Sequence, residues 1–173
     1  QSIYQKTIAF AAKHHGQQKM PGGLPYIVHL SNVAMEVFMA HKEEPNFNIE
    51  LAIQLALLHD VLEDTPLSFK ELEDVFDGVV ATGVLALTKN ASLDKKDQMQ
   101  DSLARIAEQD KEVAIVKLCD RITNLQQPPV KWNKEKIKKY QLQAITIAQA
   151  LGGKNAYLDK RIRNKIKDYA AFV

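Results

Sequence analysis

Apolar residues recur at steps of three and four along nearly the whole chain, which is the spacing of one face of an α-helix. Regular alternation of apolar and polar residues, which marks a half-buried strand, is hard to find between the turn signals. The pattern therefore predicts an all-α protein. The expected helices cover about residues 3–15, 31–41, 49–63, 68–76, 78–89, 98–108, 112–125, 133–151 and 155–170.

Turn and cap signals set the boundaries of these helices. The segment MPGGLPY makes a continuation of the first helix unfavourable, since proline and glycine disrupt helical geometry. Pro66 disfavours helical geometry in the residue before it, so the third helix should end near residue 63. Ser68 and Glu71 have the spacing of a capping box, which predicts the start of the fourth helix.

Composition narrows the class of protein. A chain of 173 residues, 46% of them hydrophobic, is long enough for one domain with a substantial core and short for two. The net charge is +2 with both signs mixed, so neither a nucleic acid nor a membrane is expected as a partner. Cys119 is the only cysteine, which excludes an internal disulfide and favours a reducing compartment. We expect a soluble, cytoplasmic protein.

One apolar stretch, LALLHDVLEDT, carries an unusual set of chargeable side chains, namely His59, Asp60, Glu63 and Asp64. Burying a carboxylate is costly unless it is paired or binds a cation. On a continuous helix His59 shares a face with Glu63, while His59 and Asp60 diverge by about 100°. A cation above the wedge between His59 and Asp60 would account for the cluster.

Two further residues could complete a metal site: His29 in PYIVHL and Asp120 in the apolar run VAIVKLCDRITNL. Two imidazoles and two carboxylates suit manganese, iron or zinc better than calcium. Structural roles compete with this interpretation for each residue taken alone. His29 could be a hydrogen-bonded core residue, and Asp120 could form a buried ion pair with Arg121.

The basic segment VKWNKEKIKKYQ places Trp132, Lys136 and Tyr140 four residues apart, so a helix would align them in one stripe. Most lysine-rich helix faces are simply solvated, and that interpretation stays open here. Cys119 adjoins Asp120 but should point about 100° away from it, into the core.

Three segments carry a family resemblance. YIVHLSNVA, ALLHDVLEDT and VKLCDRITNL resemble, in order and spacing, the motifs of the HD-domain phosphohydrolases, in the branch of the RelA/SpoT-type (p)ppGpp hydrolases. The likeness covers essentially the whole chain and is strongest to the small stand-alone alarmone hydrolases. It implies one compact HD domain over residues 1–173 and metal-dependent hydrolysis of the 3′-pyrophosphate of ppGpp or pppGpp, giving GDP or GTP and pyrophosphate.

The resemblance also implies roles for individual residues. The expected ligands of a divalent metal ion, Mn²⁺ in this interpretation, are His29, His59, Asp60 and Asp120. The acidic pair that orients or deprotonates the attacking water is Glu63 and Asp64. The residues expected to bind the nucleotide are Lys19, Tyr26, Lys89, Asn124, Trp132, Lys136 and Tyr140.

The chain departs from the family at three places. Glutamines at positions 17 and 18 replace an arginine-rich stretch, Leu30 replaces a proline, and Thr123 replaces a histidine. These changes spare the expected metal ligands and leave the base preference open. Two alternatives therefore remain: a phosphohydrolase for another nucleotide, such as NADPH losing its 2′-phosphate, and a non-catalytic nucleotide- or RNA-binding helical domain. The expected partner is a small-molecule nucleotide, and a homo-oligomer is left open.

Overall fold

Helices provide all of the regular structure, which confirms the all-α expectation. The computed structural model describes residues 1–173. No helix is both long enough and apolar enough to cross a membrane. The helices are α1 (Ser2–His15), α2 (Ile27–Glu43), α3 (Ile49–Leu58), α4 (Val61–Asp64), α5 (Phe69–Phe76), α6 (Gly78–Leu87), α7 (Gln98–Ala107), α8 (Lys111–Asn124), α9 (Lys134–Leu151), α10 (Ala156–Tyr169) and a final 3₁₀ turn, η1 (Ala170–Phe172).

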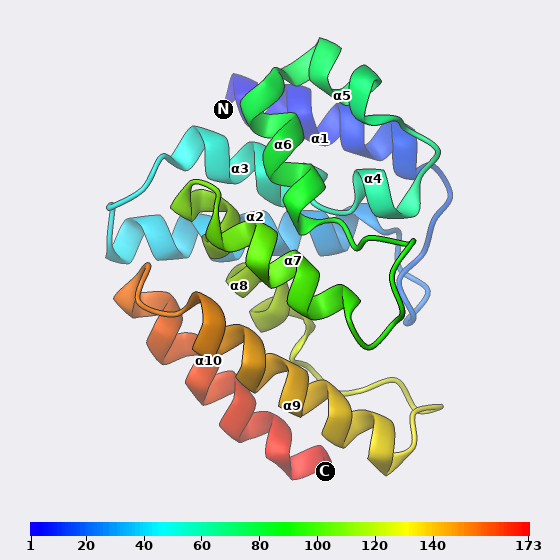
Figure 1. Cartoon of the computed structure of the whole chain (residues 1–173), viewed down its shortest axis with the longest axis vertical. Helices are drawn as coiled ribbons and strands as arrows, with labels where there is room; N and C mark the ends of the chain where they lie inside the picture. Colours follow the sequence, from blue (N-terminus) through cyan, green and yellow to red (C-terminus); the bar gives the residue numbers. More distant parts are fainter.

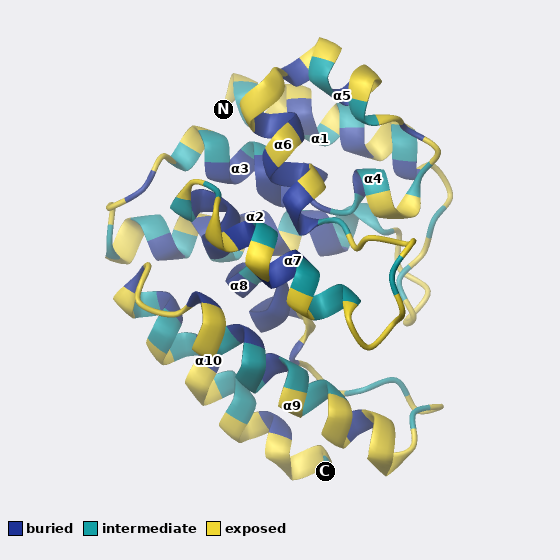
Figure 2. Cartoon of the chain, viewed as in Figure 1, coloured by how far each residue is buried: buried dark blue, intermediate teal, exposed yellow.

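The centre of the molecule is formed by α2, α3 and α8, which pack on one another (Figure 1). A single cluster of 35 buried apolar residues joins these helices to α1, α5, α6, α7, α9 and α10. Buried positions gather on α3, α6 and α8, while exposed positions gather on α5 and on the outer faces of α9 and α10 (Figure 2). The middle helices therefore supply rigid positions for side chains placed among them.

The C-terminal hairpin of α9 and α10 packs beneath this core (Figure 1). Its contact with the end of α8 is a second, smaller cluster of buried residues. The members of that cluster are Leu125, Ile137, Ala144 and Tyr169. Trp132 and Tyr140 pack against it, so the aromatic residues predicted to bind substrate also join α9 to α8.

The second helix begins at Ile27, four residues earlier than the expected start at residue 31. Winding starts directly after Pro25, because the amide of Val28 donates to the Pro25 carbonyl across 3.1 Å and the amide of His29 donates to Tyr26 across 2.9 Å. Pro25 directly precedes the N-cap residue Tyr26, so its missing amide removes no hydrogen bond from the helix. His29 consequently lies within the first turn of a helix.

The expectation of one helix over residues 49–63 is wrong. α3 ends at Leu58, a turn contains His59 and Asp60, and α4 begins at Val61. Asp60 has φ −103° and ψ −2°, away from the values of a regular helix, so the direction of the chain changes there. Because a turn interrupts the helix, the 100° separation of His59 from Asp60 that is expected on a continuous helix does not apply.

Other local expectations are confirmed. The hydroxyl of Ser68 accepts from the Glu71 amide while the Glu71 carboxylate accepts from the Ser68 amide, which makes the capping box complete. Cys119 is fully buried, and burial raises the pKa of its thiol. The structure adds a close contact at Gly83, where a β-carbon would lie 2.7 Å from Cδ2 of Leu55 and that side chain would have to move. α6 can therefore approach α3 closely.

Candidate metal centre

His59 and Asp60 occupy the turn between α3 and α4, and the turn brings their side chains to one point. Nε2 of His59 lies 2.9 Å from Oδ2 of Asp60. Nδ1 of His59 donates to the carbonyl oxygen of Ala56 across 2.8 Å. Because a carbonyl can only accept, Nδ1 carries a proton, and Nε2 is the ring nitrogen that faces the centre.

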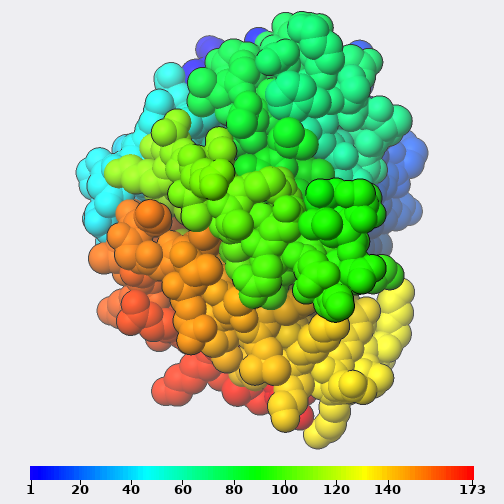
Figure 3. Space-filling view, viewed as in Figure 1, coloured from blue at the N-terminus to red at the C-terminus, as the bar shows by residue number.

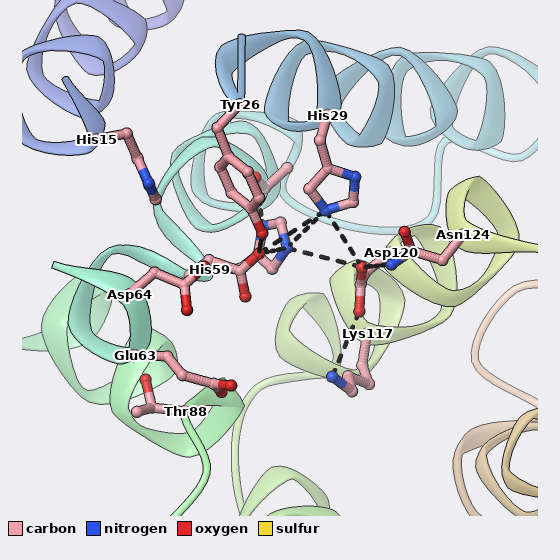
Figure 4. A network of polar contacts seen from close by, with 12 residues as sticks. His15, Tyr26, His29, His59, Glu63, Asp64, Thr88, Lys117, Asp120 and Asn124 are labelled. Carbon is pink, nitrogen blue, oxygen red and sulfur yellow. Dashed lines mark hydrogen bonds and ion pairs between the residues drawn. The ribbon is translucent and has the colours of Figure 1, made fainter. Parts of the chain in front are cut away.

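His29 and Asp120 reach the same point from α2 and α8 (Figure 4). Nε2 of His29 lies 3.3 Å from Nε2 of His59 and 3.4 Å from Oδ1 of Asp120. The same Oδ1 is 3.7 Å from Nε2 of His59. All three side chains are buried, and their ligand atoms lie within 4.8 Å of one another.

Asp60 lies beside the two histidines of this trio. Its Oδ2 is 3.7 Å from Nε2 of His29 in addition to its short contact with His59. The structure thus brings together all four residues predicted to bind a metal ion, although they come from segments far apart in the sequence.

The chemistry of this donor set fits a divalent metal ion. Two imidazole nitrogens face each other beside two carboxylates, and such mixed nitrogen and oxygen donors suit transition metals. Calcium, by contrast, takes oxygen ligands. The narrow spread of the ligand atoms would let one ion contact them after small side-chain movements.

The electrostatics of the centre favour charged carboxylates. Burial alone raises the pKa of Asp60, but the neighbouring His59 outweighs it and brings that pKa below its ordinary range. Asp120 behaves alike, because Lys117 and the two histidines outweigh its burial and lower its pKa. Burial lowers the pKa of His59, yet the charge and hydrogen bond of Asp60 raise it to about 9.

Further side chains orient the two carboxylates. The hydroxyl of Tyr26 donates to Oδ2 of Asp60, and burial together with this carboxylate raises the pKa of Tyr26 far above its ordinary value. Nδ2 of Asn124 donates to Oδ1 of Asp120 across 2.6 Å. Tyr26 and Asn124 were predicted to bind substrate, but their observed contacts are with the predicted metal ligands.

Glu63 and Asp64 are the last two residues of α4, next to the centre (Figure 4). The carboxylate of Glu63 pairs with Nζ of Lys89 and accepts the backbone amide of Lys89 across 3.2 Å. Oδ2 of Asp64 accepts from Nε2 of Gln18 across 2.8 Å. Lys89, which was expected to meet substrate phosphates, is therefore paired with a carboxylate in the structure.

The predicted aromatic and basic stripe is only partly helical. Trp132 precedes the N-cap residue Asn133, so it does not lie on α9 as the four-residue spacing had implied. The three side chains still meet: Nζ of Lys136 is 4.5 Å from the Trp132 ring centre, and the rings of Trp132 and Tyr140 are 5.2 Å apart. Lys136 and Tyr140 help line a groove of about 440 Å³.

Lys19 is the predicted substrate residue with the least support. It is exposed, and its backbone bridges to Pro25 across the loop that joins α1 to α2. A separate pocket of about 300 Å³ lies beside Gly78 and Val113 and contains none of the predicted site residues.

Asp120 does not pair with Arg121, contrary to the alternative considered from sequence. Its cationic partner is Lys117, whose Nζ lies 3.4 Å from Oδ2 of Asp120. Lys117 was not among the residues predicted for the site, although its spacing of three residues from Asp120 on one helix could have indicated it. His15 was not predicted either. Its Nδ1 is 2.7 Å from Oε1 of Gln18, which in turn contacts Asp64, and no local sequence pattern links such distant residues.

Comparisons with known proteins agree with this geometry. Residues 7–155 match the family model described as HD domain. A protein of Danio rerio named guanosine-3′,5′-bis(diphosphate) 3′-pyrophosphohydrolase MESH1 is 33% identical over 168 residues, which is 94% of this chain and 91% of that protein. A protein of Aquifex aeolicus with the same enzyme name is 31% identical over 96% of this chain and 23% of its own length.

Solved structures are similar over nearly the whole fold. One is described as "A metazoan ortholog of SpoT hydrolyzes ppGpp and plays a role in starvation responses". It superposes with a TM-score of 0.82 at 28% sequence identity, covering 97% of this chain and 96% of the other. A structure from Listeria monocytogenes, at 20% identity and a TM-score of 0.65, shares the fold.

Proposed function

The chain belongs to the HD-domain family, in its RelA/SpoT-type branch of hydrolases, and from this premise we propose that it hydrolyses the 3′-pyrophosphate of ppGpp and pppGpp. The observation that carries the proposal is the convergence of two buried histidines and two aspartates at one point. The family model ends at residue 155. We extend the domain to residues 1–173 because α10 packs on α8 and α9.

We assign metal binding to four residues: His29, His59, Asp60 and Asp120. A divalent ion bound there, in our proposal Mn²⁺, would lower the pKa of water and offset charge at phosphorus. His59 presents Nε2 because Ala56 fixes its tautomer, and Tyr26 and Asn124 orient the two carboxylates. These contacts orient the donor atoms before any ligand arrives, which is how outer partners support metal ligands.

Glu63 and Asp64 are assigned to the attacking water. In the reaction the water oxygen forms a bond to the phosphorus next to the ribose, and the bond from that phosphorus to the 3′ oxygen breaks. One of these carboxylates takes the proton of the water, and the 3′ oxygen gains a proton as GDP and pyrophosphate form. Gln18 and Lys89 fix the orientation of the two carboxylates through the contacts described above.

The nucleoside is assigned to the groove beside α9. Tyr140 in the groove and Trp132 packed beside it provide aromatic surface for a base, and Lys136 provides positive charge for a phosphate. Lys19 is the remaining substrate contact that we assign, whereas Tyr26, Asn124 and Lys89 act through the carboxylates that they contact. We also propose a cytoplasmic location, because a chain with one cysteine cannot form an internal disulfide and suits a reducing compartment.

A hydrolysis screen tests the proposed function. The purified protein would be incubated with Mn²⁺ and, in separate reactions, ppGpp, pppGpp, GTP and NADPH, and the products would be separated by ion-exchange chromatography. We expect equal amounts of GDP and pyrophosphate from ppGpp. Release of inorganic phosphate from NADPH with no turnover of ppGpp would instead assign the centre to another phosphorylated nucleotide.

A further inference from the structure

Arg121 is a buried cation without a carboxylate partner. Only 9% of its surface is exposed, and neither Nε nor Nη1 has a hydrogen-bond partner. A buried charge is costly unless it is paired, so an unpaired guanidinium next to a catalytic centre requires an explanation. Its neighbour in sequence is Asp120, which is already bound to other side chains.

Arg121 lines a small cavity of about 70 Å³ between α7, α8 and α9. The surfaces of α7 and α9 meet on the face shown in Figure 3. The polar and charged residues around the cavity include Lys89, Ser102, Lys117 and Gln143. Three cations therefore surround a space that is about twice the ~30 Å³ share of one water molecule in the liquid.

Arg121 provides the unbalanced charge of this cavity. Lys89 pairs with Glu63, and Lys117 lies 3.4 Å from Asp120. The hydroxyl of Ser102 already donates to the carbonyl of Ala86 across 3.0 Å. The one cation left to attract an anion is thus Arg121.

Arg121 contacts an aromatic ring and keeps hydrogen-bond donors available. Its Cζ lies 4.2 Å from the ring centre of Tyr140. A cation–π contact of this kind uses no conventional hydrogen bond, and Nε and Nη1 have no hydrogen-bond partner, so they remain available for an anion. Gln143 lines both the cavity and the groove assigned to the nucleoside, and Tyr140, which Arg121 contacts, lines the groove, so the cavity and the groove adjoin.

We propose that this cavity is a phosphate subsite in which Arg121 binds a phosphate group of the nucleotide whose 3′-diphosphate lies at the metal centre. The inference rests on the proposed function. The cavity is too small for a base, and arginine forms strong paired hydrogen bonds with phosphate. Two parts of ppGpp could provide this group: the 5′-diphosphate, or the outer phosphate of the 3′-diphosphate that leaves as pyrophosphate.

Calorimetry on chelator-treated protein tests the subsite apart from catalysis. GDP represents the 5′-diphosphate, and inorganic pyrophosphate represents the leaving group. Arg121→Gln should weaken binding of one of them by about tenfold or more, the scale of a charge-assisted hydrogen bond. Arg163→Gln is the matched control, because Arg163 is an exposed arginine of α10 that lies 3.8 Å from Asp159. If only the affinity for GDP falls, the subsite binds the 5′-diphosphate. If only the affinity for pyrophosphate falls, the subsite binds the outer phosphate of the leaving group.

A measurement on the wild-type protein covers the case in which Arg121→Gln does not fold. The Nε–H resonance of Arg121, assigned with Arg121→Lys, should shift when GDP or pyrophosphate is added. No shift with either ligand, or unchanged affinity for both in a folded Arg121→Gln, overturns the subsite. If binding depends on Arg121 but ppGpp is not hydrolysed, the subsite stands and the proposed function fails. If ppGpp is hydrolysed but binding does not depend on Arg121, the proposed function stands and the subsite fails.

Discussion

Gln18 bridges His15 and Asp64 through a single amide group. Its Nε2 donates to Oδ2 of Asp64 across 2.8 Å, and its Oε1 lies 2.7 Å from Nδ1 of His15. Since the amide nitrogen can only donate, the oxygen must accept from His15, and this arrangement fixes both the amide orientation and the histidine tautomer. The ring of His15, the last residue of α1, also stacks on Tyr26 with the ring centres 4.9 Å apart. His15 therefore contacts both Gln18, which donates to Asp64, and Tyr26, which donates to Asp60.

Replacing Gln18 should impair the chemical step. Gln18→Leu removes the donor that orients Asp64, and a misplaced catalytic group can lower kcat by roughly tenfold to a hundredfold. KM and metal content should be unchanged, as measured by steady-state kinetics and elemental analysis. Gln17→Leu is the control, since Gln17 is exposed. Equal losses in both variants would mean that the loop as a whole, and not the bond to Asp64, matters.

The second prediction separates metal binding from base catalysis. Glu63→Gln should retain the metal ion and lose roughly a hundredfold or more in rate, the scale of a general base. Glu73→Gln controls for loss of an exposed carboxylate near a lysine, because Glu73 lies 3.5 Å from Lys70 on α5. Elemental analysis beside the rate assay checks the result. Loss of metal in proportion to activity would make Glu63 a ligand instead.

Lys136 provides the third prediction. Its ammonium lies 4.5 Å from the Trp132 ring centre at the edge of the groove, so Lys136→Gln should raise KM roughly threefold for all phosphorylated substrates. The measured quantity is KM for ppGpp and pppGpp at constant ionic strength. Lys138→Gln, an exposed lysine of α9 that does not line the groove, is the control. The same KM in wild type and Lys136→Gln would return this helix face to ordinary solvated surface.

The fourth prediction concerns stability and pH. Ser68→Ala should lower the free energy of unfolding by about 1 kcal/mol at pH 7, the usual cost of losing an N-cap. The hydrogen bonds from Ser68 lower the pKa of Glu71 below the ordinary value of 4.5 for a glutamate. A depressed carboxyl pKa gives stability that is present above the unfolded value and is lost as the pH falls through the folded value.

The difference between wild type and Ser68→Ala should therefore shrink below about pH 4.5, where Glu71 begins to lose its charge. Urea denaturation at pH 7 and pH 3 would measure the two differences. A difference that stays constant between these pH values would mean that the carboxylate adds nothing to the cap.

Local sequence signals predicted most of the helices because caps and breakers act over a few residues. The Ser68 capping box, the break at Pro66 and the end of α1 at His15 are all of this kind. The turn at His59 and Asp60 could not be read in this way, since the apolar pattern continues through it and the turn is stabilised by contacts with other helices. The pattern also placed the start of α2 too late, because the helix begins just after Pro25, ahead of the apolar face from which it was predicted.

The candidate centre was predictable as a set of residue types, and its supporting contacts were not. The motifs brought His29, His59, Asp60 and Asp120 into one hypothesis, and the fold places them within reach of one another. The contact of Gln18 with Asp64 spans 46 positions of sequence, and no periodicity links such distant residues. Arg121 likewise has a partner, Tyr140, that becomes a neighbour only when α9 packs on α8.

The most direct test of the central claim is ppGpp hydrolysis measured together with bound metal in wild type and Asp60→Ala. Asp60 lies 2.9 Å from His59, so its removal should abolish both metal binding and turnover while the helical circular dichroism signal remains. Wild-type protein should lose its activity with a chelator and regain it when Mn²⁺ is returned, releasing GDP and pyrophosphate in equal amounts. Full hydrolysis of ppGpp by Asp60→Ala, or by chelated protein with no detectable metal, would contradict the account.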